Sequence, residues 1–311
     1  MFRGMEYVYT VYQEKSISRA AERLCISQPS LSANIKRIEA KVGYPLFDRS
    51  TKPLSLTECG EKYIRSVEKI MTVEREFSDY VNDWGELKTG SLVLGGSSLY
   101  ASWVLPGLVG AFSTRYPGVR VELVEESTAE LARLLQQGRI DMMLDNCQLD
   151  PKLFDHTVYR EETLFLAVPR QFPSVKKAAA HILSKEQIET GHWKDDELCP
   201  VPLTLFAKEP FVMLKPENDT RKRAEEILRQ AGITPEITLE LDQQLTSYHV
   251  ACSGLGIAFV SDTLIREVPA RSDVVYFKLP APRSCRPLSF SWKTGRYRTR
   301  AMQEFLNLTM E

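Results

Sequence analysis

The sequence predicts a chain of two fold classes: an all-α N-terminal part that ends in a long helix, followed by a larger α/β part. Two observations lead to this prediction. Apolar residues repeat at helical spacing through the first 88 residues, whereas short apolar strands alternate with helical segments from residue 91 onward. With 311 residues, 43% of them hydrophobic, the chain can bury the cores of two or three domains.

Two short helices are predicted close together near the N-terminus. Their apolar stripes are Ile17, Ala20, Ala21 and Leu24 for the first helix, and Leu31, Ile35, Ile38 and Val42 for the second. Because so few residues separate the stripes, the two helices must cross at a steep angle, as in a helix-turn-helix. Ser18 or Ser16 is expected to cap the first helix, and Ser27 the second.

The outward face of the second helix carries small, polar and basic side chains: Gln28, Pro29, Ser32, Ala33, Lys36 and Arg37. In a helix-turn-helix, the N-terminal residues of such a helix reach base edges in the major groove. Glutamine can pair with adenine, serine with several bases, and proline can contact a thymine methyl. We expect this face to bind DNA, together with Ser18, Ser27 and Ser30; the alternative is a capped surface helix.

A small hairpin, or wing, is predicted in residues 46–57. Short β-prone pieces flank a turn at residues 50–52, and Pro53 follows it. Arg49 and Lys52 would be available to DNA phosphates, although Arg49 could also be an incidental surface charge. Residues 1–56 hold nine Lys/Arg and five Asp/Glu, hence +4, whereas the whole chain carries −1. A phosphate-binding surface is therefore expected in this segment.

This winged helix-turn-helix resembles the DNA-binding region of the LysR-type transcriptional regulators. The matching positions are Ala20, Ala21, Leu24, Gln28, Pro29, Leu31, Ser32, Ile35, Glu39, Gly43, Leu46, Phe47, Arg49, Leu56, Thr57 and Gly60. The resemblance implies a sequence-specific regulator in which the residues at Gln28, Pro29 and Ser32 contact operator DNA. Ala33 departs from the larger polar or basic side chain of many relatives, so the resemblance does not extend to the exact base preference.

Residues 58–88 predict a linker helix that follows the winged helix-turn-helix of residues 1–57. Its seam runs in steps of four and three, with one polar interruption: Tyr63, Val67, Ile70, Glu74, Phe77, Val81 and Trp84. We expect the same helix of a second subunit to cover this seam; the alternative is packing on the chain's own effector domain. The resemblance implies a homodimer through this helix, association into a homotetramer, and an imperfectly palindromic operator in double-stranded DNA.

From residue 91, alternating strands and helices predict α/β architecture with largely parallel sheets. The resemblance implies a bilobed effector domain similar to periplasmic solute-binding proteins. We expect subdomain I in residues 91–162 and 268–311 and subdomain II in residues 163–267, with crossovers near 162–163 and 266–268. Residues 172–208 are longer than the usual connection. They are expected either to border the ligand cleft or, as the preferred alternative, to form a surface insertion.

Ligands of open α/β sheets bind beyond the carboxyl ends of strands, near helix N-termini. The candidate effector-binding residues at these places are Ser97, Ser98, Ser127 and Thr128 in subdomain I, and Leu214, Lys215 and Thr246 in subdomain II. Hydroxyl groups together with helix dipoles favour a small anionic effector. The alternative for Ser127 and Thr128 is helix capping, and for Lys215 it is simple solvation.

Other function classes lack their characteristic patterns. No apolar run reaches the about 18 residues of a membrane helix, and the N-terminus lacks the apolar core of a signal peptide. We therefore expect a cytoplasmic protein without a membrane partner. The six cysteines and four histidines show no metal-ligand spacing, so no metal or cofactor is expected. The sequence has neither a P-loop nor a GxSxG elbow, and we expect no enzymatic activity.

Overall fold

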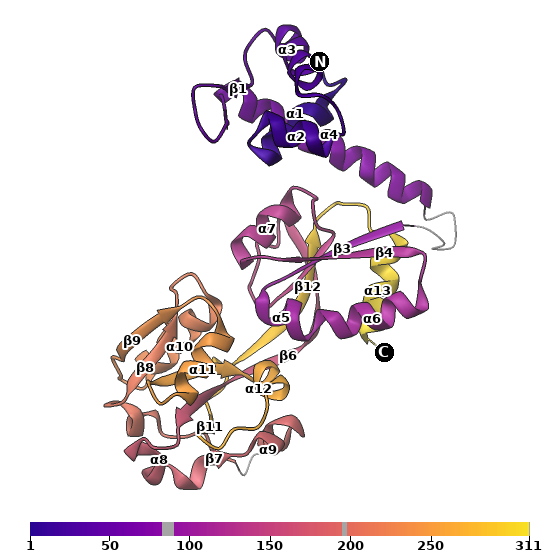
Figure 1. Ribbon diagram of the computed structural model, residues 1–311. Helices are drawn as coiled ribbons and strands as arrows, with labels where there is room; N and C mark the ends of the chain where they lie inside the picture. The colour runs from indigo at the N-terminus through magenta and orange to yellow at the C-terminus, as the bar shows by residue number, and fades with distance from the viewer. Residues whose placement is uncertain (83–89, 195–197, 311) are drawn as a thin grey trace. The chain divides into compact units, whose positions relative to one another are not determined.

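The computed structural model describes residues 1–82, 90–194 and 198–310 (Figure 1). The chain forms two compact units, Met1–Asn82 and Asp83–Glu311, and each has its own core. The first unit contains α1 (Met5–Glu14), α2 (Ile17–Arg23), α3 (Gln28–Val42), β1 (Phe47–Asp48), β2 (Ser55–Leu56) and α4 (Glu58–Asn82).

Both predicted apolar stripes pack into the core of the first unit. Their fully buried members include Ala20, Leu31 and Ile35. Helix α1, for which the sequence analysis made no prediction, completes this core with Val8 and Val11. The first unit is therefore a helix-turn-helix braced by a preceding helix.

Capping side chains fix where the two helices begin. Ser16, not Ser18, caps α2, because the Ser16 hydroxyl accepts a hydrogen bond from the Arg19 amide at 3.4 Å. Ser18 lies in the first turn of α2 and is exposed. Ser27 caps α3 by accepting from the Ser30 amide, also at 3.4 Å, and α3 ends at Gly43 with φ +90°.

The predicted seam of the linker helix changes role along α4. Tyr63 and Val67 are buried in the core of the first unit. Farther along, the side chains of Phe77 and Val81 are 68% and 50% exposed. Trp84 and the rest of the predicted helix beyond Asn82 lie outside the described residues. Only the exposed part of the seam is thus free to contact a partner.

The second unit is built from alternating strands and helices in two lobes. Up to the long strand β6 it contains β3 (Gly90–Gly96), α5 (Ser98–Trp103), α6 (Leu105–Arg115), β4 (Val119–Glu125), α7 (Thr128–Gln136), β5 (Met142–Asp145) and β6 (Phe154–Pro169). It continues with α8 (Pro173–Lys177), η2 (Ala179–His181), β7 (Ile182–Leu183), α9 (Lys185–Glu189), η3 (His192–Lys194), η4 (Leu203–Phe206), β8 (Pro210–Leu214), α10 (Asp219–Gln230) and β9 (Glu236–Leu241). It ends with α11 (Gln244–Cys252), β10 (Ile257–Ser261), α12 (Asp262–Glu267), β11 (Val274–Lys278), β12 (Cys285–Lys293) and α13 (Arg300–Met310).

Strand β6 belongs to both lobes. Its first part, up to Thr163, pairs with β12 in the first lobe, and its second part, from Leu164, pairs with β10 and β11 in the second lobe. The first lobe has the strand order β4-β3-β5-β12-β6 and the second the order β6-β10-β8-β9. The partner of β6 changes between Thr163 and Leu164, next to the predicted first crossover.

The sheets are mixed, so the prediction of largely parallel sheets is wrong. Parallel pairing is limited to β3 with β4 and β5, and to β8 with β9 and β10. Strands β6, β11 and β12 pair antiparallel. The reason is that the chain passes between the lobes twice in extended strands, and these run in opposite directions.

The structure also corrects the predicted boundary at residue 268. Strand β11 pairs with the second part of β6 and with β7, and its Val275 and Phe277 are buried in a core of the second lobe. The apolar strand β11 is stabilised by a paired strand on each side, and both of these strands, β6 and β7, belong to the second lobe at this point. The chain returns to the first lobe only between Leu279 and Cys285, where β12 begins to pair with Thr163.

Residues 172–208 are not a surface insertion, contrary to the preferred prediction. Their described part folds into α8, η2, β7, α9, η3 and η4. It contributes Val175, Leu183, Ile188 and Phe206 to the cores of the second lobe. Apolar residues within this long segment therefore cover the sheet, and its length reflects the structure that it builds.

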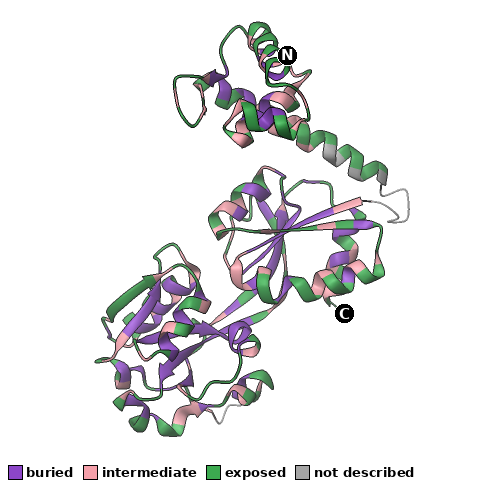
Figure 2. Ribbon diagram, in the orientation of Figure 1, coloured by how far each residue is buried: buried purple, intermediate pink, exposed green. Residues whose placement is uncertain are grey.

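Each lobe has a sheet covered on both faces. In β3, Leu92 and Leu94 pack with α5, α6 and α13, whereas Val93 packs with Leu131 and Leu134 of α7. Figure 2 shows the result: buried residues follow the inner strands of the second unit, whereas the edge strand β9 and the outer sides of the helices are largely exposed. Strand ends and helix N-termini are left as the places where polar side chains can meet.

Candidate DNA interface and effector site

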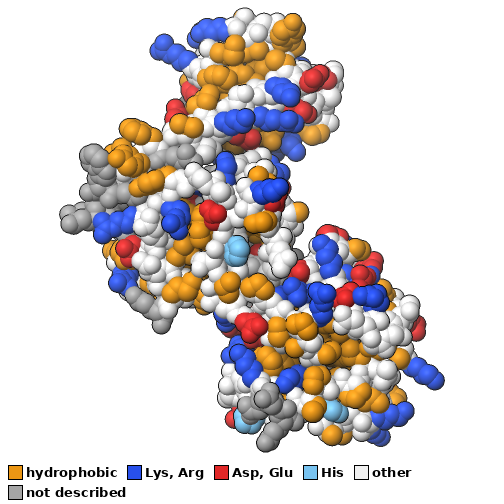
Figure 3. Space-filling view, turned by 180° about the vertical axis from the view of Figure 1, so that it is seen from behind, with side chains coloured by type: hydrophobic (Ala, Val, Ile, Leu, Met, Phe, Trp, Pro, Cys, Tyr) orange, Lys and Arg blue, Asp and Glu red, His pale blue; other side chains and the backbone are white. Residues whose placement is uncertain are grey.

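The N-terminal end of α3 presents the predicted DNA-contacting side chains to solvent. Ser27, Gln28, Pro29 and Ser30 are exposed, whereas Ser32 is half-buried. Two residues at the middle of the helix, Lys36 and Arg37, are exposed as well, and the Arg37 guanidinium donates to Asn34 Oδ1 at 3.3 Å. On the face in Figure 3, Lys and Arg side chains lie at the surface of this unit.

A carboxylate on α3 holds the wing in place. Glu39 Oε1 accepts hydrogen bonds from the Leu46 amide at 2.8 Å and the Phe47 amide at 3.4 Å, and Oε2 lies 3.1 Å from Arg49 Nη2. Glu39 thereby connects Arg49, and with it the wing, to α3. In the sequence analysis Glu39 was only a matching position; its bracing role depends on contacts seven to ten residues away.

The turn of the wing is ordered by its own side chains. Asp48 Oδ1 accepts from the Ser50 hydroxyl at 2.6 Å and the Ser50 amide at 2.9 Å, and these two bonds lower the pKa of Asp48. The hydroxyls of Thr51 and Ser55 lie 2.8 Å apart across the turn. Lys52, between them, is exposed.

The base of the wing packs tightly on α4. Thr57 Oγ1 donates to the Pro45 carbonyl at 2.7 Å and accepts from the Gly60 amide at 3.0 Å. A Cβ atom on Gly60 would lie 2.0 Å from the Leu46 carbonyl oxygen, so only glycine permits this approach. The wing, α3 and α4 therefore form one connected surface.

The candidate effector residues of the first lobe differ in what they contact. Ser97 and Ser98 are half-buried at the start of α5, and Ser97 makes no side-chain cap bond. Ser127 caps α7 by accepting from the Glu130 amide at 3.3 Å, which is the structural role named as its alternative. Thr128 Oγ1 donates to Asp145 Oδ2 at 3.0 Å.

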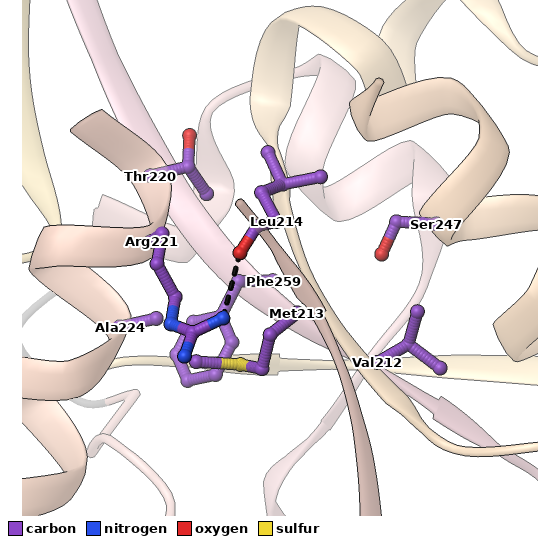
Figure 4. A pocket seen from close by; sticks show the side chains of 8 residues that line it. All are labelled: Val212, Met213, Leu214, Thr220, Arg221, Ala224, Ser247 and Phe259. Carbon is purple, nitrogen blue, oxygen red and sulfur yellow. Dashed lines mark hydrogen bonds between the residues drawn. The ribbon is translucent and has the colours of Figure 1, made fainter. Parts of the chain in front are cut away.

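The candidate effector residues of the second lobe do not converge on one place. Leu214 is buried, and its carbonyl accepts from Arg221 Nη1 at 2.7 Å in a crevice that is packed too closely to admit a ligand (Figure 4). Lys215 Nζ lies 2.7 Å from Asp242 Oδ1. Thr246 is exposed on α11.

A buried polar network that the sequence analysis missed lies where the chain crosses between the lobes. Arg286 and Glu162 are paired positions on β12 and β6, and both side chains are 0% exposed. The guanidinium donates to Glu162 Oε2 through Nε at 2.7 Å. From the first lobe, the Tyr100 hydroxyl donates to the same oxygen at 3.0 Å, and Asn146 Nδ2 lies 3.3 Å from it.

The network continues into the second lobe at the N-terminus of α10. Arg286 Nη1 donates to Asp219 Oδ2 and to Thr220 Oγ1, both at 2.9 Å. Gln244 Nε2 donates to Thr220 Oγ1 at 3.4 Å, and Gln244 Oε1 accepts from the Ser261 amide at 3.0 Å. Side chains of both lobes are thus joined through one buried ion pair.

The electrostatics of this network follow from burial and the arginine. Burial alone would raise the pKa of Glu162, but Arg286 and hydrogen bonds from Thr263, Arg286 and Tyr100 outweigh it, so the pKa lies below its usual value. Burial and then the Glu162 charge raise the pKa of Tyr100 well above its usual value. Burial likewise raises the pKa of Asp145 and of the Cys147 thiol, and the thiol is further affected by Asp145. Glu162 is held ionised, and Tyr100 is held as a neutral donor.

The described residues contain neither a candidate metal site nor a candidate membrane-spanning helix. Within residues 1–82, 90–194 and 198–310, no group of three or more His, Cys, Asp or Glu side chains is arranged to hold a metal ion. In the same ranges no helix has the length and apolar character needed to cross a membrane.

Comparison with known proteins identifies both units. Residues 2–61 match the family described as bacterial regulatory helix-turn-helix protein, lysR family, and residues 85–311 match the LysR substrate binding domain. The "Uncharacterized HTH-type transcriptional regulator YcgK" of Bacillus subtilis is 27% identical over 310 residues, covering 99% of this chain and 93% of the relative. A "Probable RuBisCO transcriptional regulator" of Cyanidioschyzon merolae is 31% identical over 255 residues, covering 80% of this chain and 77% of the relative.

Solved structures share the fold. Full-length CbnR in complex with its target DNA has a TM-score of 0.67 at 19% identity, covering 100% of this chain and 99% of CbnR. The regulatory domain of Synechocystis CcmR in complex with 2-PG has a TM-score of 0.59 at 18% identity, covering 71% of this chain and 96% of that domain. The two family matches, which take in both units, show that the chain belongs to the LysR family of transcriptional regulators, which bind DNA and carry an effector-binding domain.

Proposed function

We propose that this regulator reads an imperfectly palindromic operator with the N-terminal end of α3 and responds to a small anionic effector bound between its lobes. The observation that carries the DNA-binding part is the exposure of Gln28, Pro29 and Ser30 on a helix start fixed by Ser27. Ser32, Lys36 and Arg37 extend this face along α3, and Ser18 flanks it. Arg49 and Lys52 of the wing contact phosphates. Operator DNA places the protein in the cytoplasm.

The exposed part of the α4 seam pairs with the same helix of a second subunit. The proposed pairing is supported by large apolar side chains that are exposed on α4: Met71, Val73, Phe77, Tyr80 and Val81. An exposed seam of this kind needs a partner, and a two-fold related copy gives two recognition helices for two half-sites. Phe77→Glu is expected to convert the dimer into monomers in analytical ultracentrifugation. Lys69→Gln, which makes the same change in net charge at an exposed position of α4 outside the seam, is expected to leave the dimer intact.

Association of dimers into a homotetramer uses the edges of the two lobes. Strands β4 and β9 end the strand order of the second unit, and each exposes apolar side chains, namely Leu123 on β4 and Ile237 and Leu239 on β9. Edge strands with exposed apolar residues invite pairing or packing by another chain. These edges therefore support contacts between copies in addition to those of α4.

The proposed effector site combines first-lobe hydroxyls with the network of Arg286. Ser97, Ser98 and Thr128 supply hydroxyls, and Arg286 supplies a buried cation within the same unit. Ser127, Leu214, Lys215 and Thr246 are left out of this proposed site. Ser127 caps α7, the Leu214 carbonyl accepts from Arg221, Lys215 pairs with Asp242, and Thr246 is exposed on α11. Structures of two similar proteins carry anions: the BenM effector binding domain holds benzoate and the CcmR domain holds 2-PG.

Selection from random double-stranded DNA by the full-length protein tests this function. We expect an imperfect inverted repeat to be enriched, and its affinity to fall as salt rises, because phosphate contacts release counterions. Enrichment of no sequence, or of a single half-site, would contradict the proposed two-fold recognition. A thermal-shift screen of the full chain against small metabolites then tests the effector, since a ligand of the folded state must raise Tm.

A further inference from the structure

Among the charged partners of Arg286, Asp219 differs from Glu162 because it belongs to a helix of the second lobe and not to a crossover strand. The contacts of Arg286 with Glu162 lie on the crossover strands themselves, where the two side chains are paired across β6 and β12. Its contact with Asp219 instead reaches the first residue of α10 in the second lobe. The Asp219 side chain is 23% exposed and that of Arg286 0%, so Asp219 lies on the solvent side of the arginine.

If Asp219 separates from Arg286, its negative charge is still stabilised by other groups. Arg223 Nε lies 2.7 Å from Asp219 Oδ2, one turn along the same helix. Asp219 also stands at the N-terminus of α10, where the helix dipole stabilises a negative charge. When Asp219 and Arg286 separate, it is therefore mainly Arg286 that loses charge compensation, and Glu162 is its remaining anionic partner.

Nη2 of Arg286 is the nitrogen of the guanidinium whose donors are used least. It forms an ion pair with Glu162 Oε2 at 2.6 Å, but no atom of the described residues accepts a well-oriented hydrogen bond from it. Nη2 carries two N–H groups, and a contact with one oxygen uses at most one of them. The guanidinium therefore has unused capacity for an acceptor that can reach two of its nitrogen atoms.

From these contacts we propose that Asp219 is an internal ligand of Arg286, and that an anionic group of the effector displaces it. The proposal rests on the proposed effector site between the lobes. The charges around Arg286 favour replacement of Asp219 by the anionic group of the effector over binding of this group as an additional anion. Arg286 and Arg223 balance Glu162 and Asp219, and Asp145 lies close enough to interact with the arginine. A further anion beside these carboxylates would be repelled, whereas one that replaces Asp219 keeps the balance.

The chemistry of the displaced contact specifies the ligand group. A carboxylate or a phosphate can accept from Nη1 and from the second N–H group of Nη2 together, whereas Asp219 accepts from Nη1. Thr220 Oγ1, already bonded to Nη1, stands beside this position. Because Asp219 belongs to α10, its release removes one of the bonds between the second lobe and the crossover strands and so weakens that connection. Effector binding is thereby coupled to lobe arrangement.

The test measures binding of inorganic phosphate and of acetate to the full-length protein by calorimetry, with sodium chloride at matched ionic strength as the reference. Asp219→Asn removes the internal competitor. Its control is Glu225→Gln, which makes the same charge change on the same helix, where Glu225 pairs with Arg221. We expect Asp219→Asn to bind phosphate about five- to ten-fold more tightly than wild type or the control, because a larger fraction of molecules is competent to bind.

A second variant tests whether the gain in phosphate affinity depends on Arg286. Adding Arg286→Lys to Asp219→Asn is expected to remove the gain, since lysine lacks the planar two-nitrogen geometry. Asp219→Ser serves the same comparison if the asparagine variant does not fold. Phosphate affinity in Asp219→Asn no higher than in wild type, an equal gain in Glu225→Gln, or a gain that survives Arg286→Lys would each overturn the proposal. Operator binding by the same preparations is measured separately: its absence in wild type would contradict the proposed regulator but leave this comparison decisive for Asp219.

Discussion

Arg286 and Glu162 occupy paired positions on the two strands that connect the lobes, and both side chains are fully buried. Each is also bonded to one lobe: Glu162 to Tyr100 of the first and Arg286 to Asp219 of the second. A single ion pair at the crossover therefore carries contacts from both lobes. Its disruption affects the geometry of the whole effector domain.

Loss of one partner of this pair should destabilise the effector domain. Arg286→Gln leaves the Glu162 carboxylate buried without its cation, and such changes cost about 3–5 kcal/mol. Three of the four tryptophans, Trp103, Trp193 and Trp292, lie in the described part of the second unit, so the tryptophan fluorescence during urea unfolding reports mainly on this unit. The double variant Glu162→Gln/Arg286→Gln is the control and should lose less than the two single variants together. An unfolding free energy of Arg286→Gln within 0.5 kcal/mol of wild type, a range in which surface substitutions usually fall, would refute this role.

The pair should also shape the acid stability of the effector domain. The pKa of Glu162 is lower in the folded protein than its ordinary value of 4.5, because Arg286 and the hydrogen bonds to its carboxylate outweigh the effect of burial. The native state thus favours the ionised carboxylate. Its contribution is present above the ordinary pKa and is lost as pH falls through the lowered folded-state value. We expect the unfolding free energy of Glu162→Gln to fall less steeply below about pH 4.5 than that of wild type; equal slopes would count against the assignment.

In the first unit, Glu39 should govern DNA affinity without touching DNA. Glu39→Ala removes the acceptor of the Leu46 amide and frees Arg49, so the wing loses its brace on α3. A lost acceptor for a partly buried amide costs about 1–3 kcal/mol, which corresponds to a roughly five- to 150-fold weaker operator complex if it all falls on the wing. Fluorescence anisotropy with labelled operator measures this loss. Glu22→Ala, on the exposed surface of α2, is the matched control. Unchanged affinity in Glu39→Ala would show that the wing does not depend on Glu39.

The DNA-binding unit was predicted well because its signals are local. Ser27, Pro29 and the stripe through Leu31 and Ile35 lie within one helix, so capping and periodicity specify α3. Ser16 and Ser18 could not be separated from the sequence, since both stand where a cap can form, and only the bond to the Arg19 amide decides between them.

The effector domain was predicted less completely because its decisive contacts join distant residues. Strand β11 was assigned to the wrong lobe, since its partners in β6 lie about a hundred residues earlier in the chain. Arg286, Glu162 and Asp219 come together from three elements, and no spacing pattern connects them. The one local hint was a charged residue next to an apolar strand run, as at Glu162 before Leu164–Val168, which is a mark of a buried and paired charge.

The measurement that tests the central claim most directly is the affinity of the full-length Gln28→Ala variant for the selected operator and for a scrambled sequence of equal length. Gln28 is exposed at the first turn of α3, and Gln13, which is exposed on α1, gives the control Gln13→Ala. We predict that Gln28→Ala weakens operator binding by about 1–3 kcal/mol, the discrimination expected of one good base contact, and leaves binding to the scrambled sequence unchanged. Equal affinities of Gln28→Ala and wild type for the operator would contradict the claim that the N-terminal end of α3 reads the base sequence.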